Sequence, residues 1–308
     1  MTLVDEDTLE ARLAAIAASA PGEQEGAFGP QSMRWRIDRE AALFLGAGRA
    51  LLLQLAHPWV AAAVAQHSHA LSDPIGRFHG TFATVFAMVF GSLADAVAAS
   101  RALHRRHDTI QGTFGDSSEI YVANDRAALQ WVHATLTQTA LQAYGLVLPL
   151  ERPMLDGYYA ESRRFAGFFG LAADELPPDF EAFRTYCGEM VDGSTLAVGE
   201  TARTIAARLL AGAGSWIIIP EFYRALTAVL LPPALADAYG LPRGEREERL
   251  AAKALDRIRR FYPRLPARLR YVGPYHEARE RLSGRRLSLS TRLSNRFWIG
   301  RSSLGAPR

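Results

Sequence analysis

The stretch GRALLLQLAHPWVAAAVAQHS, residues 48–68, does most to decide the fold. Between residues 50 and 65 its apolar run is interrupted only by Gln54, His57 and Pro58. The other long apolar run, residues 82–94, is well short of the roughly 20 residues that a membrane-spanning helix needs. We therefore expect both runs to form buried helices of a globular protein, the first of them adjusted at Pro58.

Helix-start signals recur along the rest of the chain. Asp73 precedes Pro74, Ser92 has Asp95 three residues further on, and Asp125 precedes another long helical pattern. Asp and Ser at such positions cap the free amide groups of a helix. Sustained period-two alternation, which would indicate strands, is absent from the sequence. The sequence predicts an all-α fold, a single-domain helical bundle.

Composition excludes several classes of function. The 35 basic and 32 acidic residues leave a net charge of only +3, so we expect no nucleic-acid partner. Cys187 is the only cysteine, which excludes an intramolecular disulfide and a cysteine-rich zinc site. Residues 1–10 are acidic and lack the basic and apolar parts of a signal peptide. We expect a cytoplasmic protein without stable membrane insertion.

Histidine is the most informative residue type here, because seven of the eight lie between residues 57 and 133. They are His57, His67, His69, His79, His104, His107 and His133. The same window is poor in carboxylates, with no glutamate between Glu40 and Glu119. The zinc-protease pattern His-Glu-x-x-His and the di-iron pattern Glu-x-x-His are both missing. Imidazoles in apolar helices with few carboxylates suit a haem better than a hard or two-metal centre.

Spacing within the predicted helices singles out a few side chains. Arg77 and Thr81 are four residues apart and share a helix face, either as donors that line a cavity or as an ordinary solvated pair. His107 lies three residues before Ile110, near the apolar stripe, so it is a better buried candidate than His104. His57 stands in an apolar run, as a metal ligand or as a hydrogen-bonded core residue.

Several ordered motifs make the sequence resemble the rubber oxygenase (latex-clearing protein) and MpaB-type oxygenase family. They are residues 48–58 with His67, then Asp73-Pro74 with Arg77 and Thr81, then Arg106-His107, then residues 131–135, and finally Leu231-Pro232-Pro233 with residues 239–242. Together these motifs cover roughly residues 30–280, and their order makes the resemblance specific.

The resemblance implies a distantly globin-like fold around one haem b. By order and spacing, His107 takes the position of the histidine that ligates the iron. Arg77 and Thr81 correspond to polar residues of the distal side, where we expect a catalytic role. Rubber-cleaving relatives carry a lysine just before that threonine, whereas this chain has Gly80. The resemblance therefore implies a distal site without a capping lysine, where the sixth position of the iron is open or is filled by water or by His79.

The haem interpretation assigns the remaining residues as follows. His57, His67, His133 and Thr135 are expected around the cofactor. Residues 1–30 are expected to form an N-terminal helix and loop, residues 31–285 the haem-binding catalytic domain, and residues 286–308 an arginine- and serine-rich tail. Phe78, Phe82, Phe86 and Trp131 are candidates to exclude water and receive an apolar substrate.

The leading hypothesis is a haem-dependent oxygenase that acts with O2 or peroxide on an apolar, isoprenoid- or polyketide-like small molecule. Three alternatives stay open on the sequence alone. The protein could bind or sense haem without turnover, it could be a non-haem metal enzyme that uses His57, His67 and His107, or it could be a structural helical protein whose histidines serve only packing.

Overall fold

The helix-start signals of the sequence lie where helices begin in the computed structural model, which describes residues 2–69, 71–114, 120–212 and 218–305. Asp73 caps α5 (Pro74–Phe90) by accepting the Gly76 amide at 2.8 Å. Ser92 and Asp95 form a reciprocal capping box at the start of α6 (Leu93–Asp108). Asp125 caps α7 (Arg126–Val147). These caps fix the starts of the three helices that concern the candidate site.

The apolar stretch of residues 48–68 contributes to two helices, α3 (Ala47–Leu55) and α4 (Pro58–His67). Pro58 occupies the first turn of α4, where its missing amide costs nothing, and His57 is the residue before the helix. Two short elements precede this stretch, α2 (Met33–Asp38) and the 3-10 helix η1 (Ala41–Gly46).

A small hairpin is the one exception to the all-α prediction within the described residues. Strands β1 (Gln111–Thr113) and β2 (Ile120–Val122) pair antiparallel, with Gly112 opposite Tyr121. A side chain at Gly112 would meet the Gln66 side chain and the Tyr121 hydroxyl within 3 Å, so the close packing of the hairpin on α4 requires glycine there.

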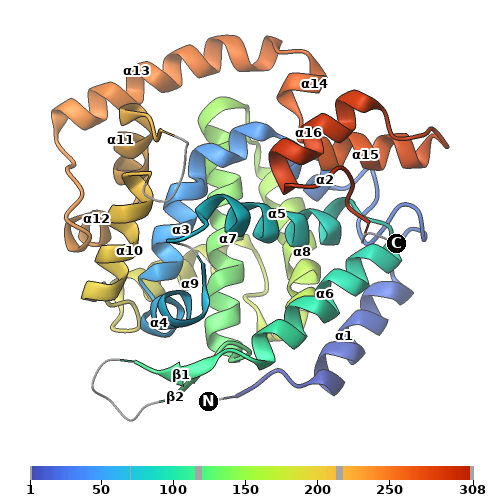
Figure 1. Cartoon of the computed structure of the whole chain (residues 1–308), viewed down its shortest axis with the longest axis horizontal. Coiled ribbons are helices and arrows are strands. Elements are labelled where there is room, and N and C mark those ends of the chain that lie inside the picture. Colours follow the sequence, from blue (N-terminus) through green and yellow to red (C-terminus); the bar gives the residue numbers. More distant parts are fainter. Residues whose placement is uncertain (1, 70, 115–119, 213–217, 306–308) are drawn as a thin grey trace.

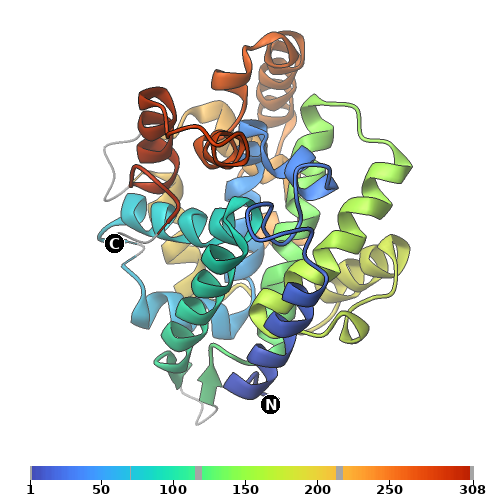
Figure 2. The same ribbon diagram turned by 90° about the vertical axis from the view of Figure 1, so that its right-hand side faces the viewer.

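The long helix α7 runs through the middle of the molecule, with the N-terminus and hairpin at one end and α13 crossing the other end (Figures 1 and 2). The remaining elements are α1 (Glu6–Ala18), α8 (Arg152–Phe165), η2 (Ala166–Phe169), η3 (Ala173–Glu175), α9 (Phe180–Asp192), α10 (Glu200–Leu210), α11 (Glu221–Leu230), α12 (Pro233–Ala238), α13 (Glu245–Phe261), η4 (Tyr262–Arg264), α14 (Ala267–Arg270), α15 (Gly273–Leu282) and α16 (Leu289–Ile299). None of the described helices combines the length and hydrophobicity needed to cross a membrane.

Both ends of the described chain belong to the same core. One apolar cluster contains Val4 and Leu13 from the N-terminal part, Phe90 from α5, and Ile299 and Leu304 from the C-terminal part. The expected tail therefore includes a helix, α16, that packs on α5 and α15. The boundaries after residues 30 and 285 stay predictions, since the segments on either side of them share this core.

Candidate functional site

One face of α5 carries the polar pair that the sequence singled out. Arg77 is half-buried and its Nη1 donates to the Ser68 hydroxyl at the end of α4. Thr81 lies one turn further along and is exposed. Between them, a Cβ built on Gly80 would meet nothing within 4 Å, so open space lies in front of this position.

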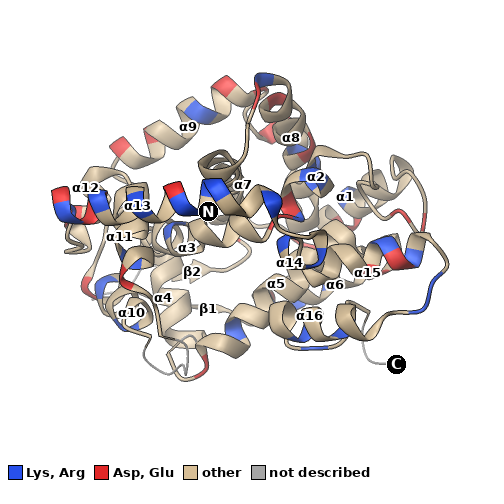
Figure 3. Cartoon of the chain, turned by 90° about the horizontal axis from the view of Figure 1, so that it is seen from above, with Lys and Arg blue, Asp and Glu red and all other residues tan. Residues whose placement is uncertain are grey.

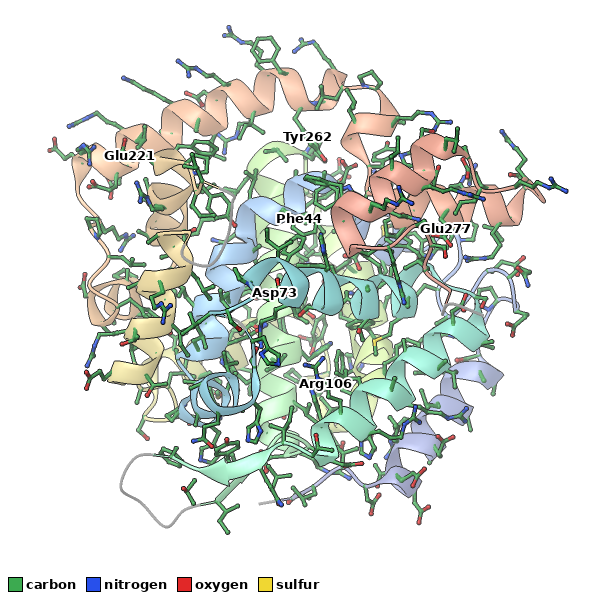
Figure 4. The ribbon with its side chains drawn as sticks, viewed as in Figure 1. Phe44, Asp73, Arg106, Glu221, Tyr262 and Glu277 are labelled. Carbon is green, nitrogen blue, oxygen red and sulfur yellow. The ribbon has the colours of Figure 1, made fainter. Side chains whose placement is uncertain are left out.

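Arg77 has a charged neighbour of the same sign. Removal from water lowers the pKa of Arg77, and the nearby guanidinium of Arg106 in α6 lowers it further. Arg106, which is labelled in Figure 4, is exposed. Within the described part of the chain, no carboxylate lies within ion-pair distance of either guanidinium. Two close arginines without a counter-ion suit an anionic ligand.

His107 follows Arg106 and is held as a neutral imidazole. Burial lowers its pKa to about 4, although a hydrogen bond that the imidazole donates to the Asn124 side chain acts in the opposite direction. The amide nitrogen of Asn124 donates to Asp108 Oδ1 at 2.7 Å, so its oxygen is left to accept from the imidazole. One ring nitrogen of His107 is thereby oriented, and the other keeps its lone pair for a ligand.

His104 differs from His107 in its partner. It is buried, and its Nε2 lies 3.7 Å from the carboxylate of Asp108. The His104 side chain is 7% exposed and is more buried than that of His107, which corrects the expectation from the sequence that His107 is the better buried of the two. The sequence missed Asn124, which immediately precedes the α7 cap and gave no signal of its own.

His67 and His57 lie at the two ends of α4, and their expected place around a cofactor stays a prediction. His67 is exposed, and its Nε2 lies 3.0 Å from the carbonyl oxygen of Gln111 in β1. His57 is buried, with an Nδ1 that has no hydrogen-bond partner in the described structure, and burial lowers its pKa. It lines a separate cavity of about 790 Å³ together with Trp59 and Gln130. Arg77, Thr81 and His107 are not among the residues that line this cavity.

His133 and Thr135 of α7 are core residues. His133 Nε2 lies 2.8 Å from the Ser162 carbonyl oxygen in α8. Thr135 donates to the Val132 carbonyl oxygen at 2.7 Å and accepts from the Gln54 side chain at 3.1 Å. These contacts give both side chains a packing role. Their expected place around a cofactor stays a prediction.

The neutral state of His133 predicts a pH-dependent stability. Burial, with a smaller contribution from Arg34, lowers the pKa of His133 to about 4 from 6.5. Between pH 4 and pH 6.5 this histidine is protonated in the unfolded chain but not in the folded chain. The stability that it contributes is therefore full above pH 6.5 and falls as the pH drops. We expect about 2 kcal/mol to be lost from this group between pH 7.5 and pH 5. Urea denaturation at both pH values should show this loss reduced in H133Q, and an unchanged difference would contradict it.

His79 faces away from Gly80 and Thr81, because successive helical residues are about 100° apart. Its Nε2 lies 3.0 Å from the carbonyl oxygen of Phe297 in α16. This contact leaves His79 unsuited to the sixth iron position that the sequence suggested for it.

The expected aromatic wall is part of the core between α5 and α16. Phe78 and Phe82 pack around Phe44, which also contacts Trp298 with ring centroids 4.4 Å apart (Figure 4). Trp131 is buried and donates to the Leu53 carbonyl oxygen at 2.9 Å. The phenylalanine rings support the helix that carries Arg77, from its opposite side, whereas Trp131 belongs to a different apolar cluster, with Leu53 of α3.

The described residues contain no group of three or more His, Cys, Asp or Glu side chains that could hold a metal ion. The non-haem alternative required His57, His67 and His107 together, and the described structure does not gather them. A haem needs only one axial protein ligand and supplies its own four nitrogens. His107 is compatible with that simpler requirement.

A family model for the catalytic domain of "ER-bound oxygenase mpaB/B'/Rubber oxygenase" matches residues 34–264. The chain belongs to this family. Neither the curated proteins nor the solved structures contain a match to the chain. The match runs from α2 to η4, so it includes Arg77, Thr81, Asn124 and His107, whereas α14, α15 and α16 lie beyond it. The resemblance inferred from the sequence is confirmed for this domain of the MpaB/rubber oxygenase family.

Proposed function

We propose that this MpaB/rubber oxygenase family member is a haem b-dependent oxygenase that oxidises an apolar, isoprenoid- or polyketide-like small molecule. The single observation that carries the proposal is His107, a neutral imidazole with one nitrogen hydrogen-bonded to Asn124. Metal-bound histidines characteristically donate their other ring nitrogen to an acceptor of this kind. The family match supports an oxygenase reaction.

The polar residues beside His107 fit a haem. A haem carries two propionates, and Arg77 with Arg106 supplies two guanidiniums that no described carboxylate neutralises. The donor set is therefore one axial nitrogen and a cationic pair, with open space at Gly80. When bound, haem supplies the oxidising chemistry toward O2 or peroxide.

The chain's own residues would hold and orient the reactants. His107 would hold the iron, and the Asn124 oxygen would fix the plane of the His107 ring. Arg77 is desolvated, which strengthens its attraction for an anionic group. We propose that it binds a propionate or polarises a bound oxidant, and that the Thr81 hydroxyl donates a hydrogen bond on the same face.

The optical spectrum of the purified protein, after reconstitution with haem, is the decisive test. We expect a Soret band at one haem per chain, and oxygen consumption when terpenoid or polyketide compounds are added. A protein without a Soret band would overturn the haem assignment. A Soret band without oxygen or peroxide consumption would favour a haem-binding protein without turnover.

Gly80 allows a direct test of the open distal site. A lysine there meets no described atom at its Cβ and recreates the residue of rubber-cleaving relatives. In G80K we expect the reconstituted haem to become six-coordinate and low-spin and to bind O2 at least about tenfold more slowly.

Replacing a helical glycine also stabilises the helix by up to about 1 kcal/mol, and G80A is the matched control for this effect. G80A should share the stabilisation and keep the wild-type spectrum. If G80K and G80A had identical spectra, the side chain at position 80 would not reach the iron, and the assignment of the distal site to this face would be wrong.

A further inference from the structure

Helix α16 turns polar side chains toward the protein and large apolar side chains toward the solvent. The side chains that it buries are Thr291, Asn295 and Ile299, two of which are polar. On the opposite side, Leu289, Leu293 and Phe297 are 77%, 63% and 65% exposed. These three residues, spaced four apart, form one stripe along the helix, which we term the α16 stripe. Leaving three large apolar side chains in water is unfavourable unless something covers them.

The inward polar residues of α16 are bound by glutamates. Glu280 of α15 accepts hydrogen bonds from the Thr291 hydroxyl at 2.9 Å and the Ser288 hydroxyl at 2.7 Å. Glu277 accepts from the Asn295 amide at 2.6 Å. These contacts fix the rotation of α16, so the outward direction of the stripe is a property of the folded chain.

Positive charge surrounds the stripe. Residues 257–308 contain 14 arginines and two glutamates, whereas the preceding 256 residues contain 21 basic and 30 acidic residues. The two glutamates are those that bind α16 from inside. Arginines are seen on α16 in Figure 3, where no acidic residue is seen on that helix. The exposed arginines of this helix and its preceding loop are Arg285, Arg286, Arg292 and Arg296.

None of those four arginines has a carboxylate within ion-pair distance in the described part of the chain. Arg292 and Arg296 flank the stripe on one side of the helix, and Ser290 and Ser294 flank it on the other. Leucine and phenylalanine on one face, bordered by arginines, is the composition of a helix that lies in the surface of an anionic membrane.

We propose that the α16 stripe docks this protein on an anionic lipid surface, with Leu289, Leu293 and Phe297 inserted among the acyl chains and Arg292 and Arg296 on the headgroups. The charge favours lipid phosphates over a neutral partner. The stripe is also too small for a stable second copy, because dimer interfaces bury roughly 800 Å² on each partner.

The docking surface is joined to the candidate site through helix α5, on opposite sides of that helix. Helix α16 packs on α5, and His79 of α5 contacts the Phe297 carbonyl oxygen in the stripe. Arg77, Gly80 and Thr81 lie on the same α5 helix. The docking itself does not depend on the haem assignment.

Sedimentation of the full chain with phosphatidylglycerol vesicles tests the docking. We expect binding to these vesicles, a loss of binding in 0.5 M salt, and little binding to phosphatidylcholine. The variant L289S/L293S/F297S should partition at least about tenfold more weakly, since each inserted apolar side chain contributes to binding. R292Q/R296Q should weaken binding to anionic vesicles only.

A matched control is I120S, which removes an exposed apolar side chain from β2, away from α16 (Figure 1). It should bind vesicles as the wild type does, and circular dichroism should show all variants folded. Unchanged binding in the triple variant would overturn the proposal. The proposal would also be overturned if the wild type did not bind vesicles. The same holds if the wild type sedimented as a dimer and the triple variant as a monomer.

Discussion

Replacing His107 with alanine is expected to abolish stable haem binding. His107 is the one described histidine with a neutral hydrogen-bonded ring beside Arg77 and Arg106. Loss of a partner that only orients a ligand weakens metal binding by about 10–100-fold, so loss of the ligand itself should exceed about 100-fold. Haem titration followed at the Soret band measures the affinity. N124A, which removes only the orienting oxygen, should fall within the smaller range.

H104A is the matched control, because His104 is one helical turn away and also buried. It contacts Asp108, and we expect its replacement to leave haem affinity within about threefold of the wild type. Added imidazole should partly restore the Soret band of H107A by entering the vacated space. Retention of haem by H107A, or its loss in H104A alone, would move the ligand to another residue.

Local signals account for most of what the sequence predicted correctly. Asp73, Ser92 and Asp125 each cap a helix through contacts within three residues, and such contacts are visible in the sequence. The hairpin escaped prediction because its strands have three residues each, too few to show an alternation.

From the sequence, only the helix faces that carry the candidate residues could be predicted, and not how those faces are arranged around the site. Spacing placed Arg77 with Thr81, and His107 near a buried stripe, and the structure adds which elements lie opposite. Asn124 reaches His107 because the hairpin turns the chain back, and no pattern within α6 contains that information. Residues 286–308 were predicted only as an arginine- and serine-rich tail, and the buried face of α16 depends on glutamates in α15 that bind its polar residues.

Glu40→Ala is expected to destabilise the folded chain strongly. The Glu40 side chain is 1% exposed and accepts two hydrogen bonds from Arg270, both at 2.8 Å. It also accepts from the Tyr262 hydroxyl at 2.9 Å. Removing one member of a buried ion pair costs about 3–5 kcal/mol, because the other charge is left without compensation. Urea denaturation should show a loss at the lower end of this range, about 3 kcal/mol, since Arg270 retains some contact with water.

Two further variants separate the charge from the packing. E40Q keeps the volume and one acceptor, so its loss should be smaller than that of E40A. E245A removes one partner of the exposed pair with Arg249 and should stay within about 0.5 kcal/mol of the wild type. Glu40 lies inside the family match and Arg270 beyond it, so this pair joins α14 to the catalytic domain. If E40A were as stable as E245A, the attachment of α14–α16 would have to rest on the shared apolar core alone.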